Sequence, residues 1–169
     1  MELEPDVACI LIIGYGNLLC GDDAAGVLAA RELEHHFQDD NEVEVIAAQQ
    51  LTPELAEVVS GSGFVLFLDA SQEETPGRVR CEAVEPMGDP RLVTHHLTPA
   101  SLLSTAQRIY GQAPPAASLT LAGRSFALSN ELSPIVRERL PEFIRQAKEI
   151  VASHRWLVGT PIASGSPVG

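Results

Sequence analysis

The sequence predicts an α/β fold: a three-layer sandwich in which a mostly parallel, five-stranded sheet lies between helices on both of its faces. Three observations lead to this prediction. Short, continuous apolar runs alternate along the chain with amphipathic stretches of helical period. Strands and helices that alternate in this way form parallel sheets covered on both sides. The length of 169 residues suits one domain with a substantial core.

Five segments have the composition of strands. The first, 7–13, is a continuous apolar run that ends at Gly14, as expected for a central parallel strand buried on both faces. Segment 78–84 alternates polar and apolar residues, which is typical of an edge or antiparallel strand with one solvated face. The other three predicted strands are 43–47, 64–68 and 117–122.

The helices are predicted from their start signals. Asp22 is expected to cap a first helix that runs to about Phe37. Each later helix begins where a capping hydroxyl precedes a proline at the first helical position. These pairs predict helices from 52–53 to about 60, from 98–99 to about 110, and from 133–134 to about 154, the last kinked or divided near Pro141.

Composition limits the possible partners and compartment. The chain carries 23 acidic and 11 basic side chains, a formal net charge of −12, which disfavours nucleic acid and anionic membranes as partners. No apolar run reaches the roughly 20 residues that cross a bilayer. The acidic start, 1–6, lacks the positive charge of a secretory signal, so a cytoplasmic protein is predicted. We expect residues 1–155 to form the domain and residues 156–169, rich in Gly and Pro, to form a flexible tail.

Candidate site residues follow from the sheet. In parallel α/β sheets, ligands bind beyond the carboxyl ends of the strands. The polar residues and glycines just past the predicted strands are Asn17, Asp22, Asp23, Gln49, Gln50, Asp69, Gly123 and Arg124.

The glycine turn after the first strand permits two interpretations. Gly14-x-Gly16 before a helix is similar to a dinucleotide-binding turn, but Leu19 stands where the third glycine is wanted. Asp22 and Asp23 would also lie where a pyrophosphate needs positive potential. A nucleotide-binding α/β protein is therefore kept only as an alternative. Asp22 can cap the helix while Asp23 points elsewhere.

Carboxylates and imidazoles suggest the chemistry. Asp69 follows a very apolar strand, and His95 and His96 form a pair on a predicted loop. Such a set can bind a borderline divalent metal such as nickel or zinc, or can supply a base and a proton shuttle for water attack. The chain has neither a Gly-x-Ser-x-Gly elbow nor a His-Glu-x-x-His helix, so serine-hydrolase and zincin mechanisms lack their residues.

Four sequence landmarks together resemble a known family. They are Gly14-x-Gly16-Asn17-x-Leu19-x-x-Asp22-Asp23-x-x-Gly26-Val27, Leu68-Asp69-Ala70, Thr94-His95-His96-Leu97-Thr98, and Gly123 with Leu132-Ser133-Pro134. In this order and spacing they are similar to the maturation endopeptidases of nickel-iron hydrogenases. The resemblance covers about residues 8–152.

The resemblance implies a fold, a reaction and a site. The family has a twisted, largely parallel sheet with one antiparallel strand. Its members cut a C-terminal extension from the hydrogenase large-subunit precursor after nickel insertion. Its metal-contacting positions fall on Asp23, Asp69 and His95, with His96 as the alternative. The nickel is supplied by the substrate, so no permanent cofactor is expected, and a monomer is expected.

Further roles are expected around this site. Asn17 and the amides between Gly14 and Gly16 are candidates to hold the substrate backbone or the developing oxyanion. Gln49 and Gln50 are candidates for substrate positioning, because 47–50 stands where many members have an Asp-Gly-Gly stretch thought to help choose the substrate.

Three departures from the family leave the substrate open. Besides 47–50, they are Ala24-Ala25, beside the acidic residue, and Asn130, where glycine is common. They affect the choice of hydrogenase more than the activity. A non-cleaving nickel-binding or assembly module, using the same residues, remains the second hypothesis.

Overall fold

The computed structural model describes residues 10–73, 75–87 and 96–158. Its five strands form one sheet in the order β2-β1-β3-β5-β4. The strands are β1 (Ile10–Tyr15), β2 (Val43–Ala48), β3 (Phe64–Ser71), β4 (Val79–Val84) and β5 (Ala116–Ala122). The helices are the 3-10 turn η1 (Gly21–Ala24), α1 (Ala25–His36), α2 (Leu55–Ser60), α3 (Pro99–Tyr110) and α4 (Pro134–Val158).

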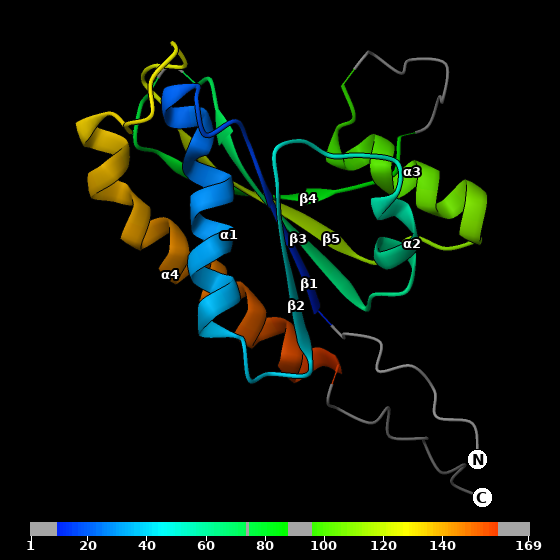
Figure 1. Cartoon of the computed structure of the whole chain (residues 1–169). Coiled ribbons are helices and arrows are strands. Elements are labelled where there is room, and N and C mark those ends of the chain that lie inside the picture. Colours follow the sequence, from blue (N-terminus) through cyan, green and yellow to red (C-terminus); the bar gives the residue numbers. More distant parts are fainter. Residues whose placement is uncertain (1–9, 74, 88–95, 159–169) are drawn as a thin grey trace, which may run out of the picture.

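The observed sheet confirms the predicted fold class. β1 pairs in parallel with β2 and with β3, and β3 pairs in parallel with β5. β4 lies antiparallel to β5 at one edge, so the alternating segment is both an edge strand and an antiparallel one. Helices α1 and α4 cover one face of the sheet and α2 and α3 cover the other (Figure 1).

Each face of the sheet buries its own apolar core. Ile10 and Ile12 point into the core beneath α1 and α4, whereas Leu11 and Ile13 point into the core beneath α2 and α3. This alternation requires apolar residues at every position of β1, which explains the continuous apolar run in the sequence.

Two glycines allow α1 to rest directly on the sheet. A Cβ on Gly14 would lie 2.3 Å from the carbonyl oxygen of Gly26 and 2.4 Å from Cβ of Ala30. A Cβ on Gly26 would lie 2.4 Å from the carbonyl oxygen of Leu68. The close approach sets the start of α1, and with it η1, at the carboxyl ends of β1 and β3.

The predicted starts of the helices were partly wrong. The start at Thr98 is confirmed: its hydroxyl accepts the Ser101 amide in a capping box. The prediction that Asp22 caps the first helix is wrong, because η1 precedes α1 and Asp22 bonds elsewhere, as described below. Helix α2 begins at Leu55, after a turn, rather than at the predicted proline.

The last helix is longer than predicted and is not divided. Pro141 lies inside α4, which continues to Val158. The expected tail boundary at 156 therefore falls within the helix, and residues 159–169 lie outside the described residues. Within the described part of the chain, no helix combines the length and hydropathy needed to span a membrane.

Candidate functional site

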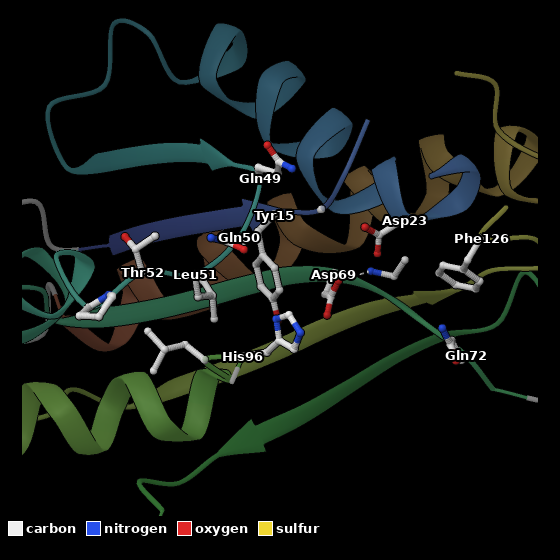
Figure 2. A pocket seen from close by; sticks show the side chains of 14 residues that line it. Tyr15, Asp23, Gln49, Gln50, Leu51, Thr52, Asp69, Gln72, His96 and Phe126 are labelled. Carbon is white, nitrogen blue, oxygen red and sulfur yellow. Dashed lines mark hydrogen bonds between the residues drawn. The ribbon is translucent and has the colours of Figure 1, made fainter. Parts of the chain in front are cut away.

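A cavity of about 610 Å³ opens at the carboxyl ends of β1, β2 and β3, where the sequence predicted the site. Its ionisable or polar-aromatic lining residues are Asp23, Asp69, Tyr15 and His96 (Figure 2). The rest of its wall is formed by Gly16, Gln49, Gln50, Leu51, Thr52, Pro53, Ala70, Gln72, Leu97 and Phe126.

Asp23 is held in place by the glycine turn. Its Oδ2 accepts the backbone N–H of Asn17 at 2.7 Å, while its Oδ1 makes no hydrogen bond to any described residue. Gly16 has φ +151°, and a Cβ there would lie 1.9 Å from the Asp23 carbonyl oxygen. Only glycine fits this approach, so the turn fixes one oxygen of Asp23, while Asp23 itself lines the cavity.

Asp69 lies within β3, next to the same cavity. The pKa of its carboxyl is raised to about 6, chiefly by burial and also by the charge of Asp23, and hydrogen bonds from Tyr15 and from the Ala70 amide oppose this rise. The Ala70 N–H donates to Oδ1 at 2.8 Å. Two partly desolvated carboxylates that repel each other are an arrangement suited to a cation.

Tyr15 ends β1 and faces both carboxylates. Burial raises the pKa of its hydroxyl far above the ordinary value, and the charges of Asp69 and Asp23 raise it further. Tyr15 is therefore a neutral hydrogen-bond donor throughout the physiological range.

His96 is the histidine that the described residues bring to the site. It is exposed at the mouth of the cavity, and Figure 2 shows the hydroxyl end of Tyr15 pointing toward its ring. His95, the histidine predicted from the motif, lies outside the described residues, so that assignment stays a prediction. The described residues contain no group of three or more His, Cys, Asp or Glu side chains arranged to hold a metal.

The predicted substrate-positioning residues divide into two groups. Gly16, Gln49 and Gln50 line the cavity, and both glutamines are exposed. Gly14 and Asn17 do not line it. Gly14 is buried beneath α1, and the Asn17 side chain accepts the Leu19 amide at 2.9 Å.

The amides expected to bind an oxyanion are already engaged. The Gly16 N–H donates to the Ala48 carbonyl at 3.2 Å, and the Asn17 N–H donates to Asp23. These two backbone N–H groups are therefore not free to bind an oxyanion, and the oxyanion role stays a prediction for the side-chain amide of Asn17. The same bonds speak against the nucleotide alternative, because Asp23 occupies the place of an anion at the turn.

Asp22 is the residue whose role the sequence analysis assigned wrongly. It is fully buried, and its Oδ2 accepts the amides of Arg124 (2.7 Å) and Ser125 (3.0 Å). Ser133 donates to it twice, from its amide to Oδ1 and from its hydroxyl to Oδ2, both at 2.7 Å. Burial alone would raise the Asp22 pKa, but these four bonds outweigh it and lower the pKa.

The bonds to Asp22 explain why Gly123 and Ser133 are landmarks of the sequence. They tie η1 to the segment after β5 and to the residue before α4. Gly123 fits because a Cβ there would lie 2.7 Å from the Phe126 ring and 2.8 Å from Cβ of Asp22. Phe126 thereby forms a wall of the cavity, which the sequence analysis missed together with Tyr15. The available signal for the role of Asp22 was the pair of adjacent aspartates at 22 and 23, because capping one helix accounts for only one of them.

Comparison with known proteins gives structural matches. No protein-family model matches the chain, and no curated protein does. The fold is similar to the nickel-iron hydrogenase maturation protease HycI of Thermococcus kodakarensis KOD1 (TM-score 0.67, 23% identity, covering 86% of this chain and 93% of that chain). The hydrogenase maturating endopeptidase HybD of E. coli also has a TM-score of 0.67, with 25% identity over 85% of this chain and 92% of that chain. The hydrogenase 2 maturation peptidase of Thaumarchaeota archaeon SCGC_AB-539-E09 has a TM-score of 0.64, with 24% identity over 85% and 97%.

These matches agree with the resemblance drawn from the motifs. They cover most of both chains, and the names of the matched proteins agree with the prediction of a peptide hydrolase. The observed fold is therefore the one that the resemblance to the hydrogenase maturation proteases implies.

Proposed function

We propose that the protein is an endopeptidase that removes the C-terminal extension of a nickel-iron hydrogenase large-subunit precursor after nickel insertion. The observation that carries the proposal is the pair Asp23 and Asp69, which face one cavity at the carboxyl ends of the strands. The similarity to hydrogenase maturation proteases supports the choice of substrate. We place the reaction in the cytoplasm and assign it to a monomer.

The proposed recognition is electrostatic. Nickel already held by the precursor completes its ligand shell with Asp23, Asp69 and a histidine, so the protein needs no permanent cofactor. Nickel accepts carboxylate and imidazole ligands. Its positive charge offsets the mutual repulsion of the two carboxylates and favours release of the Asp69 proton. The motif favours His95 as the third ligand, and the position of His96 in the cavity wall makes it the alternative.

Hydrolysis then needs a positioned water molecule. Its oxygen bonds to the scissile carbonyl carbon, the carbon–nitrogen bond breaks, and a proton passes to the leaving amine. The substrate's nickel holds the peptide in place and polarises the reacting oxygen. Among the described groups, Tyr15 stays protonated and only donates a hydrogen bond.

The test is the intact mass of the precursor, with and without nickel, after incubation with the protein. We expect loss of a C-terminal peptide from the nickel-loaded form alone, and no loss with Asp23→Ala. His95→Ala and His96→Ala identify the histidine. His35→Ala, at the exposed end of α1, is the matched control and is expected to retain full activity.

The alternatives to this proposal predict other results for the mass of the precursor. A stable complex without any change in precursor mass would support the non-cleaving assembly module. Normal processing by both Asp23→Ala and the two histidine variants would refute the site assignment. Thermal unfolding of each variant shows whether a loss of processing reflects a loss of fold.

A further inference from the structure

A second groove joins the cavity of the carboxylates. Its volume is about 460 Å³, and it shares Gly16 and Gln49 with that cavity. Figure 2 shows the Gln49 side chain turned toward α1, and Gln49 lines both spaces. We call this space the lateral groove. Its own walls are formed by Asn17, Leu18, Leu19, Val27, Arg31, Ala47 and Ala48.

Arg31 places a positive charge on the wall of the lateral groove. It is exposed on α1 and forms neither an ion pair nor a hydrogen bond with any described residue. The chain around it has 23 acidic side chains against 11 basic ones. An unpaired guanidinium in a groove of such a protein attracts a carboxylate from a partner.

Leu19 gives the groove an apolar contact surface. Its side chain is 60% exposed although its backbone is fixed. The Leu19 amide donates to Asn17 Oδ1 at 2.9 Å, and its carbonyl accepts the Ser129 amide at 2.9 Å. A large exposed apolar side chain on a backbone that hydrogen bonds already hold is suited to contact with a partner, since the backbone needs no further ordering on binding.

We propose that the lateral groove binds the stretch of substrate peptide next to the scissile bond. An apolar side chain of this stretch packs on Leu19, and a carboxylate pairs with Arg31. Continuity with the cavity and the sign of the free charge identify the occupant as an acidic and apolar peptide segment. The inference rests on the proposed function, because it assigns the groove to that substrate.

The experiment compares rates of processing of nickel-loaded precursor by variants of exposed residues. Arg31→Glu is expected to raise KM about tenfold or more with kcat unchanged, because the groove then repels the carboxylate. Arg31→Lys is expected to stay within about threefold of the wild type. Leu19→Ser is expected to raise KM several-fold.

Matched controls lie on α3, on the other face of the sheet. Arg108→Glu makes the same charge reversal at an exposed arginine without a described partner. Ile109→Ser removes an apolar side chain that is 66% exposed. Both are expected to leave KM unchanged.

A charge exchange completes the test. Replacing the acidic residues near the cleavage site of the precursor by lysine is expected to weaken processing by the wild type and to restore it with Arg31→Glu. Equal KM values for Arg31→Glu, Arg108→Glu and the wild type would overturn the inference while leaving the proposed function intact. Absence of cleavage by the wild type itself would instead refute the proposed function and the inference with it.

Discussion

Replacing Asp69 with asparagine is expected to stabilise the fold and to abolish processing. Burial raises the pKa of the Asp69 carboxyl from 3.8 to about 6, and the charge of Asp23 contributes in the same direction. The gap between the two values corresponds to about 3 kcal/mol that the ionised carboxylate costs the folded state. Water that reaches the cavity screens part of this cost, so we expect a gain of about 1 to 2 kcal/mol near pH 8.

The gain is expected to vanish in acid. Because its pKa is raised in the folded state, the folded protein binds the Asp69 proton more tightly than the unfolded chain does. The cost of Asp69 is therefore absent below about pH 4, grows between about pH 4 and about pH 6, and is constant above that. Asparagine carries no charge at any pH and keeps an oxygen for the Ala70 amide, which donates at 2.8 Å in the wild type.

The assay is urea unfolding of the wild type and Asp69→Asn near pH 4, pH 6 and pH 8, combined with precursor processing. Asp39→Asn, at an exposed position after α1, is the control and is expected to leave stability unchanged. A variant that is no more stable than the wild type near pH 8 would refute the reasoning. So would an equal gain near pH 4 and near pH 8, since burial of a charge could not produce it.

Three further predictions concern residues that shape the site. Asp22→Ala leaves three backbone amides without their acceptor and is expected to cost about 3 kcal/mol or more in thermal unfolding. The lowered Asp22 pKa means that the wild type loses this contribution only below about pH 4, as acid-unfolding curves would show. Gly26→Ala would bring a Cβ within 2.4 Å of the Leu68 carbonyl and is expected to cost about 2 to 3 kcal/mol, despite alanine's higher helix propensity. Thr98→Ala removes a capping box and is expected to cost about 1 kcal/mol in urea unfolding, with processing unchanged.

The fold was predictable because its determinants are local. Each central strand is a short apolar run, since both faces of the sheet are buried, and each run ends in turn residues. The capping box at Thr98 likewise lies within four residues. The start of the first helix was predicted wrongly for the opposite reason: the acceptor roles of Asp22 are used by Arg124, Ser125 and Ser133, more than 100 residues away.

The lining of the cavity was predictable as far as the rule that ligands bind beyond the carboxyl ends of parallel strands applies. The rule identified Asp23, Asp69 and the two glutamines, because parallel strands bring their carboxyl ends to one edge. It missed Tyr15, which belongs to the last position of β1 and was assigned to the turn. It also missed Phe126, whose place in the wall depends on the Asp22 bonds to the segment after β5.

Under the proposed function, the cost of ionising the buried Asp69 carboxyl favours nickel-loaded precursor over precursor that lacks nickel. A precursor without nickel that closes the cavity must desolvate two like charges with no compensating cation. A nickel-loaded precursor supplies the cation, and the screened cost of about 1 to 2 kcal/mol for ionised Asp69 would be recovered. That difference corresponds to about 5-fold to 30-fold in affinity. The same burial that lowers the stability of the free protein would therefore make cleavage depend on completed metal insertion, without any metal bound permanently to the enzyme.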